Sequence, residues 1–403
     1  MADIDHRAVA AQPSGIPELD RVLGSGLVPG SVLLLAGEPG IGKSTLLLQV
    51  AHTYAQRTGT ALIVTGEESA GQVRLRAGRL GALHERLFLA AETDLTAVLE
   101  HVDAVSPSLL VIDSVQTIGD QHTDGVPGGV TQVKAVTAAL VELAKRRTIT
   151  TVLVGHVTKD GHVAGPRTLE HLVDVVLAFE GDEQTALRLV RATKNRYGPV
   201  EELGCFRMTR DGMEGVSDPS GLFIARHDRP VPGTCLTTTL HGRRPMLAEV
   251  QALATPPHEG PQRRSVSGLD PARVALMVAV AATHTSVDLK GRDVFVATVG
   301  GLRAVEPALD LAIVVALASS VRMAPVRPGL AAFGEVGLAG EVRAVRDLDR
   351  RLAEAARLGV TTALVPVDVP KPPTGMTCVR VLDVSQAVAH TCSSAGLASR
   401  LGT

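Results

Sequence analysis

The sequence predicts an α/β fold for its first half, with a largely parallel sheet that helices cover on both faces. Short, apolar, β-rich runs alternate there with longer segments of helical pattern, and polar motifs follow the carboxyl ends of the runs. The expected strands are Ser31–Ala36, Ala61–Thr65, Leu109–Asp113, Thr151–Gly155 and Asp174–Phe179. The expected helices are Lys43–Thr58, Ser69–Leu80, Leu95–Val105 and Thr131–Arg146.

The second half of the chain has a different character. Residues Asp211–Pro219 are polar and rich in turn formers, which indicates a boundary between domains shortly after them. We therefore expect two domains, at residues 1–220 and 228–403. In the second, Ala272–Ala282 and Ala308–Val321 each follow an acidic residue and a proline, which is a typical start signal of a helix.

The composition narrows the class of protein. Hydrophobic residues make up 45% of the 403 residues and charged residues 20%, as in a globular, core-forming chain. The longest apolar runs are too short to span a bilayer and Met1–Asp20 has no secretory signal, so we expect a cytoplasmic protein without membrane contact. The four cysteines are too scattered for a zinc site or a disulfide framework. A net charge of −2 gives no overall attraction to nucleic acid.

A phosphate-binding motif lies between the first expected strand and the first expected helix. The pattern G-x-x-x-x-G-K-[ST] lets backbone amides surround a phosphate at the amino end of a helix. Lys43 is placed to reach the β- and γ-phosphates of ATP, and Ser44 to hold Mg²⁺. The candidate nucleotide-binding residues are Gly37, Glu38, Pro39, Gly40, Ile41, Gly42, Lys43, Ser44 and Thr45, together with Asp113 and His156.

Carboxylates follow the next strands. Asp113 ends an apolar strand, where it can bind the Mg²⁺ ion or its water shell. Glu67 and Glu68 follow Ala61–Thr65, and either could polarise the attacking water; we favour Glu67, with Glu68 in support. An exposed charge at a helix start is the alternative for this pair. His156 could sense the γ-phosphate, or could be an ordinary hydrogen-bonded loop histidine.

Five strings together resemble the bacterial RadA (Sms) family. They are Gly37–Thr45, Thr65–Ser69, Asp113–Thr117, Gly155–Lys159 and Lys194–Gly198, the last of which is similar to the family's K-N-R-F-G motif with Tyr197 for Phe. The resemblance covers nearly the whole chain. It implies a RecA-like ATPase core that forms a hexameric ring, hydrolyses ATP and promotes branch migration of recombination intermediates.

The resemblance also implies roles for single residues. Lys194 and Arg196 would reach the ATP of the neighbouring subunit and stabilise the charge of the transition state. The implied partners are single-stranded and branched DNA, further copies of the chain and, as an additional candidate, a RecA recombinase. Two glycine-rich loops, 119–130 and 155–167, would face the channel of the ring, with Lys134, Lys159 and Arg167 as candidate phosphate contacts.

The second half resembles the α+β domain of Lon protease. Residues Gly334–Ala355 are similar to the region around Lon's catalytic lysine, where we expect Arg351 at the lysine position. Ala308 stands at the position of the nucleophilic serine. Alanine is no nucleophile and arginine stays protonated, so we expect a proteolytically inactive domain. The candidate DNA contacts on it are Arg263, Arg264, Arg322 and Arg346.

Three alternatives stay open at this point. An ATP-dependent protease would need the missing nucleophile. A regulatory ATPase similar to KaiC would use a comparable core without moving DNA. A recombination accessory of this family could act without motor activity. RadA proteins usually begin with a four-cysteine zinc module, and only Met1–Gln12 precede the expected core, so we expect no zinc.

Overall fold

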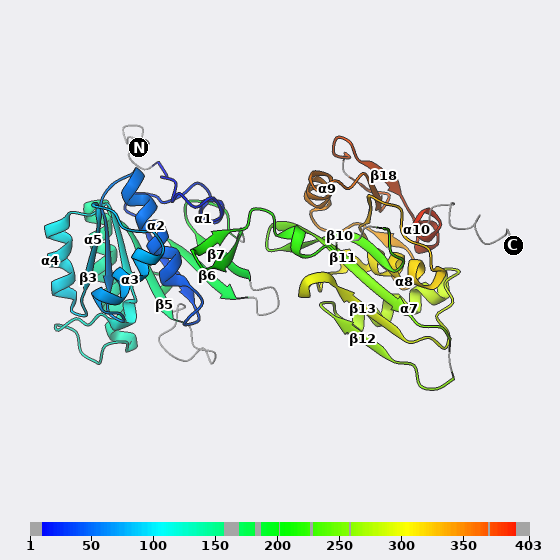
Figure 1. Ribbon diagram of the computed structural model, residues 1–403, viewed down its shortest axis with the longest axis horizontal. Helices are drawn as coiled ribbons and strands as arrows, with labels where there is room; N and C mark the ends of the chain where they lie inside the picture. Colours follow the sequence, from blue (N-terminus) through cyan, green and yellow to red (C-terminus); the bar gives the residue numbers. More distant parts are fainter. Residues whose placement is uncertain are drawn as a thin grey trace. The chain divides into compact units, whose positions relative to one another are not determined.

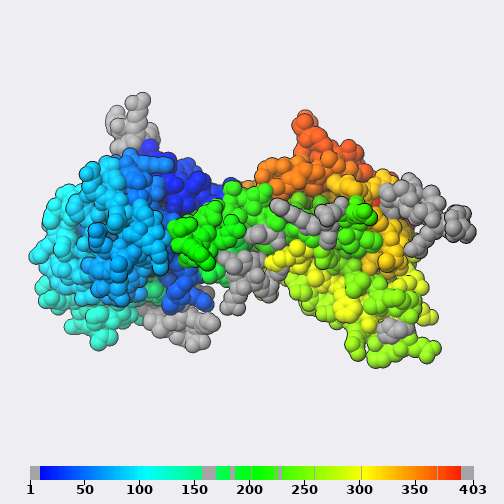
Figure 2. Space-filling model, viewed as in Figure 1, coloured from blue at the N-terminus to red at the C-terminus, as the bar shows by residue number. Residues whose placement is uncertain are grey.

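The computed structural model describes residues 10–156, 169–181, 187–200, 202–225, 229–257, 259–369 and 371–391. The chain divides into two compact units, residues 1–217 and 218–403. In Figures 1 and 2 the first unit is coloured from blue to green and the second from green to red. Each unit has its own sheet and its own buried cores.

The first unit is built on a nine-stranded sheet in the order β3-β2-β4-β5-β1-β6-β7-β8-β9. The strands from β3 to β6 are parallel, and β7, β8 and β9 continue the sheet in antiparallel fashion. The strands are β1 Val32–Gly37, β2 Ala61–Thr65, β3 Leu87–Ala91, β4 Leu109–Asp113, β5 Thr150–His156, β6 Val175–Gly181, β7 Leu187–Asn195, β8 Leu203–Thr209 and β9 Gly212–Gly215.

Helices cover both faces of this sheet (Figure 1). They are α1 Pro17–Leu23, α2 Lys43–Arg57, α3 Ala70–Arg79, α4 Leu95–Val105 and α5 Val130–Arg147, with a short 3-10 turn η2 at Val115–Thr117. Leu33 and Leu35 of β1 join the core under α1 and α2, whereas Val32 and Leu34 join the core under α4 and α5. Successive side chains of a strand point to opposite faces, so this one apolar strand contributes to both cores.

The second unit contains a mixed seven-stranded sheet in the order β12-β13-β11-β10-β14-β17-β18 and a separate β15-β16 hairpin. The strands are β10 Thr234–His241, β11 Arg244–Ala254, β12 Arg264–Ser267, β13 Val294–Thr298, β14 Leu330–Ala332, β15 Glu335–Val336, β16 Val342–Arg343, β17 Thr362–Val365 and β18 Thr377–Arg380. The helices are α7 Pro271–His284, α8 Asp310–Arg322, α9 Leu348–Arg357 and α10 Val384–Thr391, with 3-10 turns η3 Pro219–Leu222, η4 Val299–Gly301 and η5 Pro307–Leu309.

Two cores fill this second unit, one on each face of its sheet. Helices α7, α8 and α10 pack on one core and α9 on the other. Asp270 caps α7 as expected, because its carboxylate accepts from the amides of Ala272 and Arg273. The second signal also marks a helical start, because Glu306 precedes Pro307, the first residue of η5, and η5 runs directly into α8 at Asp310. Glu306 makes no side-chain cap there, since its carboxylate pairs with Arg351. Among the residues described, no helix is long and apolar enough to cross a membrane.

Candidate active site

The phosphate-binding loop connects the end of β1 to the start of α2. It turns through two glycines with positive φ, Gly40 at 74° and Gly42 at 111°. The positive φ of Gly42 favours glycine, and the terminal methyls of Met208 and Met213 lie 2.6 Å from where a Cβ would be and would have to move. Among the described residues, the backbone amides from Gly40 to Ser44 find no hydrogen-bond acceptor. They therefore form a cradle for an anion at a helix amino end.

The ammonium of Lys43 lies inside this loop. Its Nζ donates to the carbonyls of Gly37 at 2.9 Å and Glu38 at 2.8 Å, and lies 3.3 Å from Nδ1 of His156. Burial lowers the pKa of Lys43, against the opposing effect of two nearby carboxylates. An ammonium has no lone pair, so Nδ1 of His156 is the acceptor and the ring proton is on Nε2. Lys43 is thus held next to the amides that would surround a phosphate.

Ser44 and Asp113 supply oxygen atoms beside the loop. Ser44 lies in the first turn of α2 and Asp113 at the end of β4, and the hydroxyl of Ser44 lies close enough to the carboxylate to affect its pKa. Burial raises the pKa of Asp113, and the hydroxyl of Ser44 opposes this shift. Hydroxyl and carboxylate oxygens are donors that Mg²⁺ prefers, so this pair fits a Mg²⁺ ion bound together with the phosphates.

The two adjacent glutamates face different partners. Glu67 Oε1 accepts from Ser114 Oγ at 2.6 Å and from His156 Nε2 at 2.8 Å. Burial would raise the pKa of Glu67, but these two partners and the charge of the loop lysine lower it below its ordinary value. Glu68 instead pairs with Arg76 of α3, at 2.5 Å. Glu67 is therefore the carboxylate that lies beside the phosphate-binding loop.

The groups suited to hydrolysis meet at one edge of the sheet. Lys43, Ser44, Glu67, Asp113 and His156 follow or lie at the carboxyl ends of parallel strands β1, β2, β4 and β5. Parallel strands bring their carboxyl ends to the same edge, which is where such folds bind ligands. The arrangement offers an anion cradle, a cation, two metal-binding oxygens and an ionised carboxylate that can polarise water.

Lys194 lies at the side of the same sheet where the parallel strands begin, opposite to the side where they end. It pairs with Val176 near the start of β6, whereas Gly37 at the end of β1 pairs with Phe179, further along β6. Its Nζ donates to the carbonyl oxygens of Glu170 at 2.5 Å and Val173 at 2.8 Å, which precede β6. One chain therefore does not bring Lys194 to its own phosphate-binding loop.

Arg196 lies beside Lys194 and is oriented by a buried carboxylate. Its Nη1 donates to Oδ1 of Asp174 at 3.0 Å. Asp174 is 3% exposed and also accepts from Nζ of Lys145 at 2.5 Å and from the amide of Val32 at 3.0 Å. Burial would raise the pKa of Asp174, but these donors lower it, so the carboxylate stays charged and keeps its hold on Arg196.

The candidate DNA contacts are only partly described. Lys134 is exposed on α5, and Arg263 and Arg264 are exposed at the start of the edge strand β12. Lys159 and Arg167 lie outside the described residues. These five residues therefore stay predictions, and the structure gives only their exposure where it describes them.

Arg351 of the second unit is enclosed rather than free. It is 1% exposed, and its guanidinium donates to both carboxylate oxygens of Glu306, at 2.9 and 2.5 Å. It also donates to the carbonyls of Thr238 at 2.6 Å and Arg346 at 2.9 Å. Ala308 is buried in η5 and has no group that could attack a peptide. Within the described residues, this arginine holds structural elements together.

Two residues at the site were not singled out from the sequence. Ser114 holds Glu67, and Arg76 lines a small cavity with Ser44 and Asp113. Ser114 directly follows Asp113, the expected Mg²⁺ ligand, which is a local signal of its position. No signal existed for Arg76, because its partner is set by how α3 packs.

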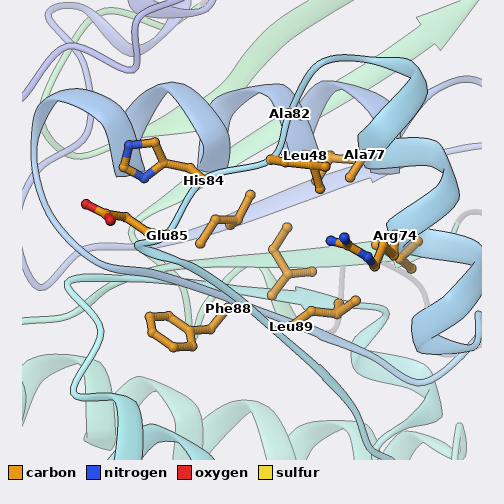
Figure 3. A pocket seen from close by; sticks show the side chains of 12 residues that line it. Leu48, Arg74, Ala77, Ala82, His84, Glu85, Phe88 and Leu89 are labelled. Carbon is orange, nitrogen blue, oxygen red and sulfur yellow. The ribbon is translucent and has the colours of Figure 1, made fainter.

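A larger cavity lies elsewhere in the first unit. It has a volume of about 460 Å³ and lies between α2, α3 and β3. Figure 3 shows Phe88 and Leu89 of β3 on one side of it, and His84 and Arg74 at its ends. None of the residues expected to bind nucleotide lines it, so we do not place the reaction there.

Family models match a segment of each unit. The model of the AAA domain matches residues 4–162, and that of the Lon protease (S16) C-terminal proteolytic domain matches residues 281–372. A KaiC-like protein of Pyrococcus horikoshii OT3 covers 52% of this chain and 99% of its own, at 21% identity and a TM-score of 0.44.

Curated relatives are similar over nearly the whole chain. DNA repair protein RadA of Mycolicibacterium smegmatis is 53% identical over 96% of this chain and 84% of the relative. DNA repair protein RadA of Streptococcus pyogenes serotype M1 is 44% identical over 96% of this chain and 86% of the relative. With an AAA-type ATPase unit, a Lon-like unit and this degree of identity, the chain belongs to the RadA family of DNA repair proteins.

Proposed function

We propose that this chain is a DNA-dependent ATPase that acts in homologous recombination and DNA repair. The observation that carries the proposal is the meeting of Lys43, Ser44, Asp113 and Glu67 at one edge of the sheet. These are the groups that phosphoryl transfer needs: a cation, oxygens for Mg²⁺ and a carboxylate near the attacking water. Relatives named as DNA repair proteins support the biological setting.

In the proposed reaction, the loop amides bind the β-phosphate and Lys43 turns from the loop carbonyls to the β- and γ-phosphates. Bound Mg²⁺ neutralises phosphate charge, and Ser44 and Asp113 would hold it. Glu67 polarises the water that attacks the γ-phosphorus, and phosphate leaves from ADP. His156 loses its contact with Lys43 in this step, which makes it suited to sense the γ-phosphate.

We further propose that the active unit is a homo-hexameric ring. Lys194 and Arg196 lie at the edge of the sheet opposite to their own phosphate-binding loop, as residues that serve a neighbouring chain would. In trans they would add positive charge where the transferred phosphoryl group spreads its negative charge. Hydrolysis around the ring would then drive branch migration of DNA that passes through it.

The second unit is proposed to be proteolytically inactive and to bind DNA. Ala308 cannot act as a nucleophile, and Arg351 is sequestered by Glu306. Arg263 and Arg264 are exposed side by side at the start of an edge strand, where they could contact DNA phosphates. Single-stranded and branched DNA are the proposed ligands, and a RecA recombinase is a candidate protein partner.

The decisive experiment measures ATP hydrolysis by the full chain with and without single-stranded DNA. We expect DNA to increase the rate, and Lys43→Ala to abolish it, because no other cation lies inside the described part of the loop. Hydrolysis by Lys43→Ala at the rate of the unaltered chain would refute the site. A rate of ATP hydrolysis that neither single-stranded nor branched DNA changes would favour a regulatory ATPase over a DNA motor.

A further inference from the structure

The loop after β4 is fixed to the loop after β2 by close backbone contacts. The amide of Gly66 donates to the carbonyl of Asp113 at 3.1 Å. An added Cβ at Gly66 would lie only 2.1 Å from Oγ1 of Thr117, so the two loops approach as closely as glycine allows. Thr117 Oγ1 in turn donates to the carbonyl of Ser114 at 2.7 Å. The backbone of Ser114 is thus held in place independently of its side chain.

The hydroxyl of Ser114 acts on one oxygen of Glu67. Ser114 is 0% exposed, and its Oγ donates to Glu67 Oε1 at 2.6 Å. His156 Nε2 donates to the same oxygen at 2.8 Å. Glu67 Oε2 has no hydrogen-bond partner among the described residues. Two donors on one oxygen fix the rotation of the carboxylate and leave the other oxygen to accept from water.

We propose that Ser114 is a positioning residue, which orients Glu67 so that its Oε2 receives the proton of the attacking water. This inference rests on the proposed ATPase function and adds to it a residue outside the phosphate-binding motif. The bond from His156 cannot do the same work alone, because His156 also contacts Lys43 and changes partners when that lysine turns to a phosphate. Among the described residues, Ser114 makes no hydrogen bond to the lysine or the loop, so its bond to Glu67 does not have to break when the lysine turns.

The proposal predicts a specific kinetic defect for Ser114→Ala. A hydrogen bond to a charged group contributes about 1.5–3 kcal/mol, which corresponds to a fall in kcat of about 10- to 100-fold. The affinity for a non-hydrolysable ATP analogue should stay unchanged, since Ser114 is not part of the loop. Loss of this donor also raises the pKa of Glu67, so the acidic limb of the pH–kcat profile should move to higher pH.

Ser31→Ala is a matched control. Ser31 is 1% exposed and donates a hydrogen bond of the same length, 2.6 Å, to the carbonyl of Val28. It precedes β1 and lies at the edge of the sheet opposite to Glu67. Both variants lose one buried hydroxyl and one hydrogen bond, so both should melt at a lower temperature than the unaltered chain. Only Ser114→Ala should lose kcat and shift the pH profile.

A double-mutant cycle with Glu67→Gln tests whether Ser114 acts through Glu67. Single-turnover hydrolysis is measured for the unaltered chain, both single variants and the double variant. The proposal expects that Ser114→Ala has little effect once Glu67 is glutamine. An equal loss in both backgrounds, or no loss in kcat in the unaltered background, overturns it. Hydrolysis that survives Lys43→Ala would instead overturn the proposed function, and this inference with it.

Discussion

A mixing experiment tests whether each active site is shared between two chains. Lys194→Ala removes the proposed trans-acting cation, and Glu67→Gln removes the proposed base. Along β6, Lys194 pairs with Val176 and the end of β1 pairs with Phe179, which is an offset of about 10 Å at about 3.3 Å per residue. The ammonium of Lys194 points further away, toward carbonyls before β6. The register and this direction both place Lys194 away from its own loop.

The expected recovery follows from this geometry. Loss of a trans-acting cation should lower kcat about 1,000-fold or more, so each variant alone is nearly inactive. In a random, equal mixture, about one interface in four joins an intact loop and Glu67 from one chain to an intact Lys194 from the next. The activity should therefore recover to about a quarter of that of the unaltered protein and peak near equal amounts.

The assay is ATP hydrolysis by co-expressed variants, purified together and compared at several ratios. Mixing Lys194→Ala with the double variant Lys194→Ala/Glu67→Gln serves as the control, because no interface then carries both groups. The double variant should give no recovery. If the mixture hydrolyses ATP no faster than the two variants would separately, at every ratio, a site shared through Lys194 is refuted.

Two further predictions concern packing. Gly66→Ala places a methyl 2.1 Å from Thr117 Oγ1 and so pushes the loop that carries Glu67, the proposed base, out of position. This variant should lower kcat about 100-fold and still bind a non-hydrolysable ATP analogue. Its control is Gly71→Ala, which adds a methyl in open space on α3 and should keep full activity. Glu306→Ala leaves Arg351 buried without its partner and should lower the free energy of unfolding by about 3 kcal/mol, as measured by urea denaturation. Burial would raise the pKa of Glu306, but Arg351 lowers it below 4.5, so the stability from this pair is present above pH 4.5 and lost as the pH falls through the lowered value. The Glu306→Ala chain should lack that acid-dependent loss, and an unchanged urea midpoint would show that the pair does not stabilise the unit.

The central strands could be predicted because they are apolar throughout. The expected Ala61–Thr65 and Leu109–Asp113 match β2 and β4 to the residue. Strand β3, Leu87–Ala91, was missed because it lies at the sheet edge and only Ala90 is buried within it. The antiparallel strands β7 to β9 were missed for a related reason. Strand β7 mixes buried with half-buried positions, and β8 and β9 are buried only in their first halves, so none of them is a fully buried apolar run like a central parallel strand.

Only the residues of the candidate site that belong to sequence motifs could be predicted. The phosphate-binding pattern and the carboxylates after two strands predicted that Lys43, Ser44 and Asp113 lie close together, because the carboxyl ends of parallel strands meet at one side of the sheet. The choice between Glu67 and Glu68 needed the structure, since adjacent residues on a turn point in different directions. Side-chain contacts between loops that are far apart in the sequence leave no periodic signal.

The carboxylate that orients Arg196 has a mechanical consequence. Asp174 accepts a hydrogen bond from the amide of Val32, the first residue of β1. The last residue of β1, Gly37, is the first residue of the phosphate-binding loop. The six-residue strand β1 would therefore connect the proposed nucleotide site of a chain to the cation that it would offer to its neighbour. In the proposed ring, these strands would relay the occupancy of one site to the next without any movement of the whole unit.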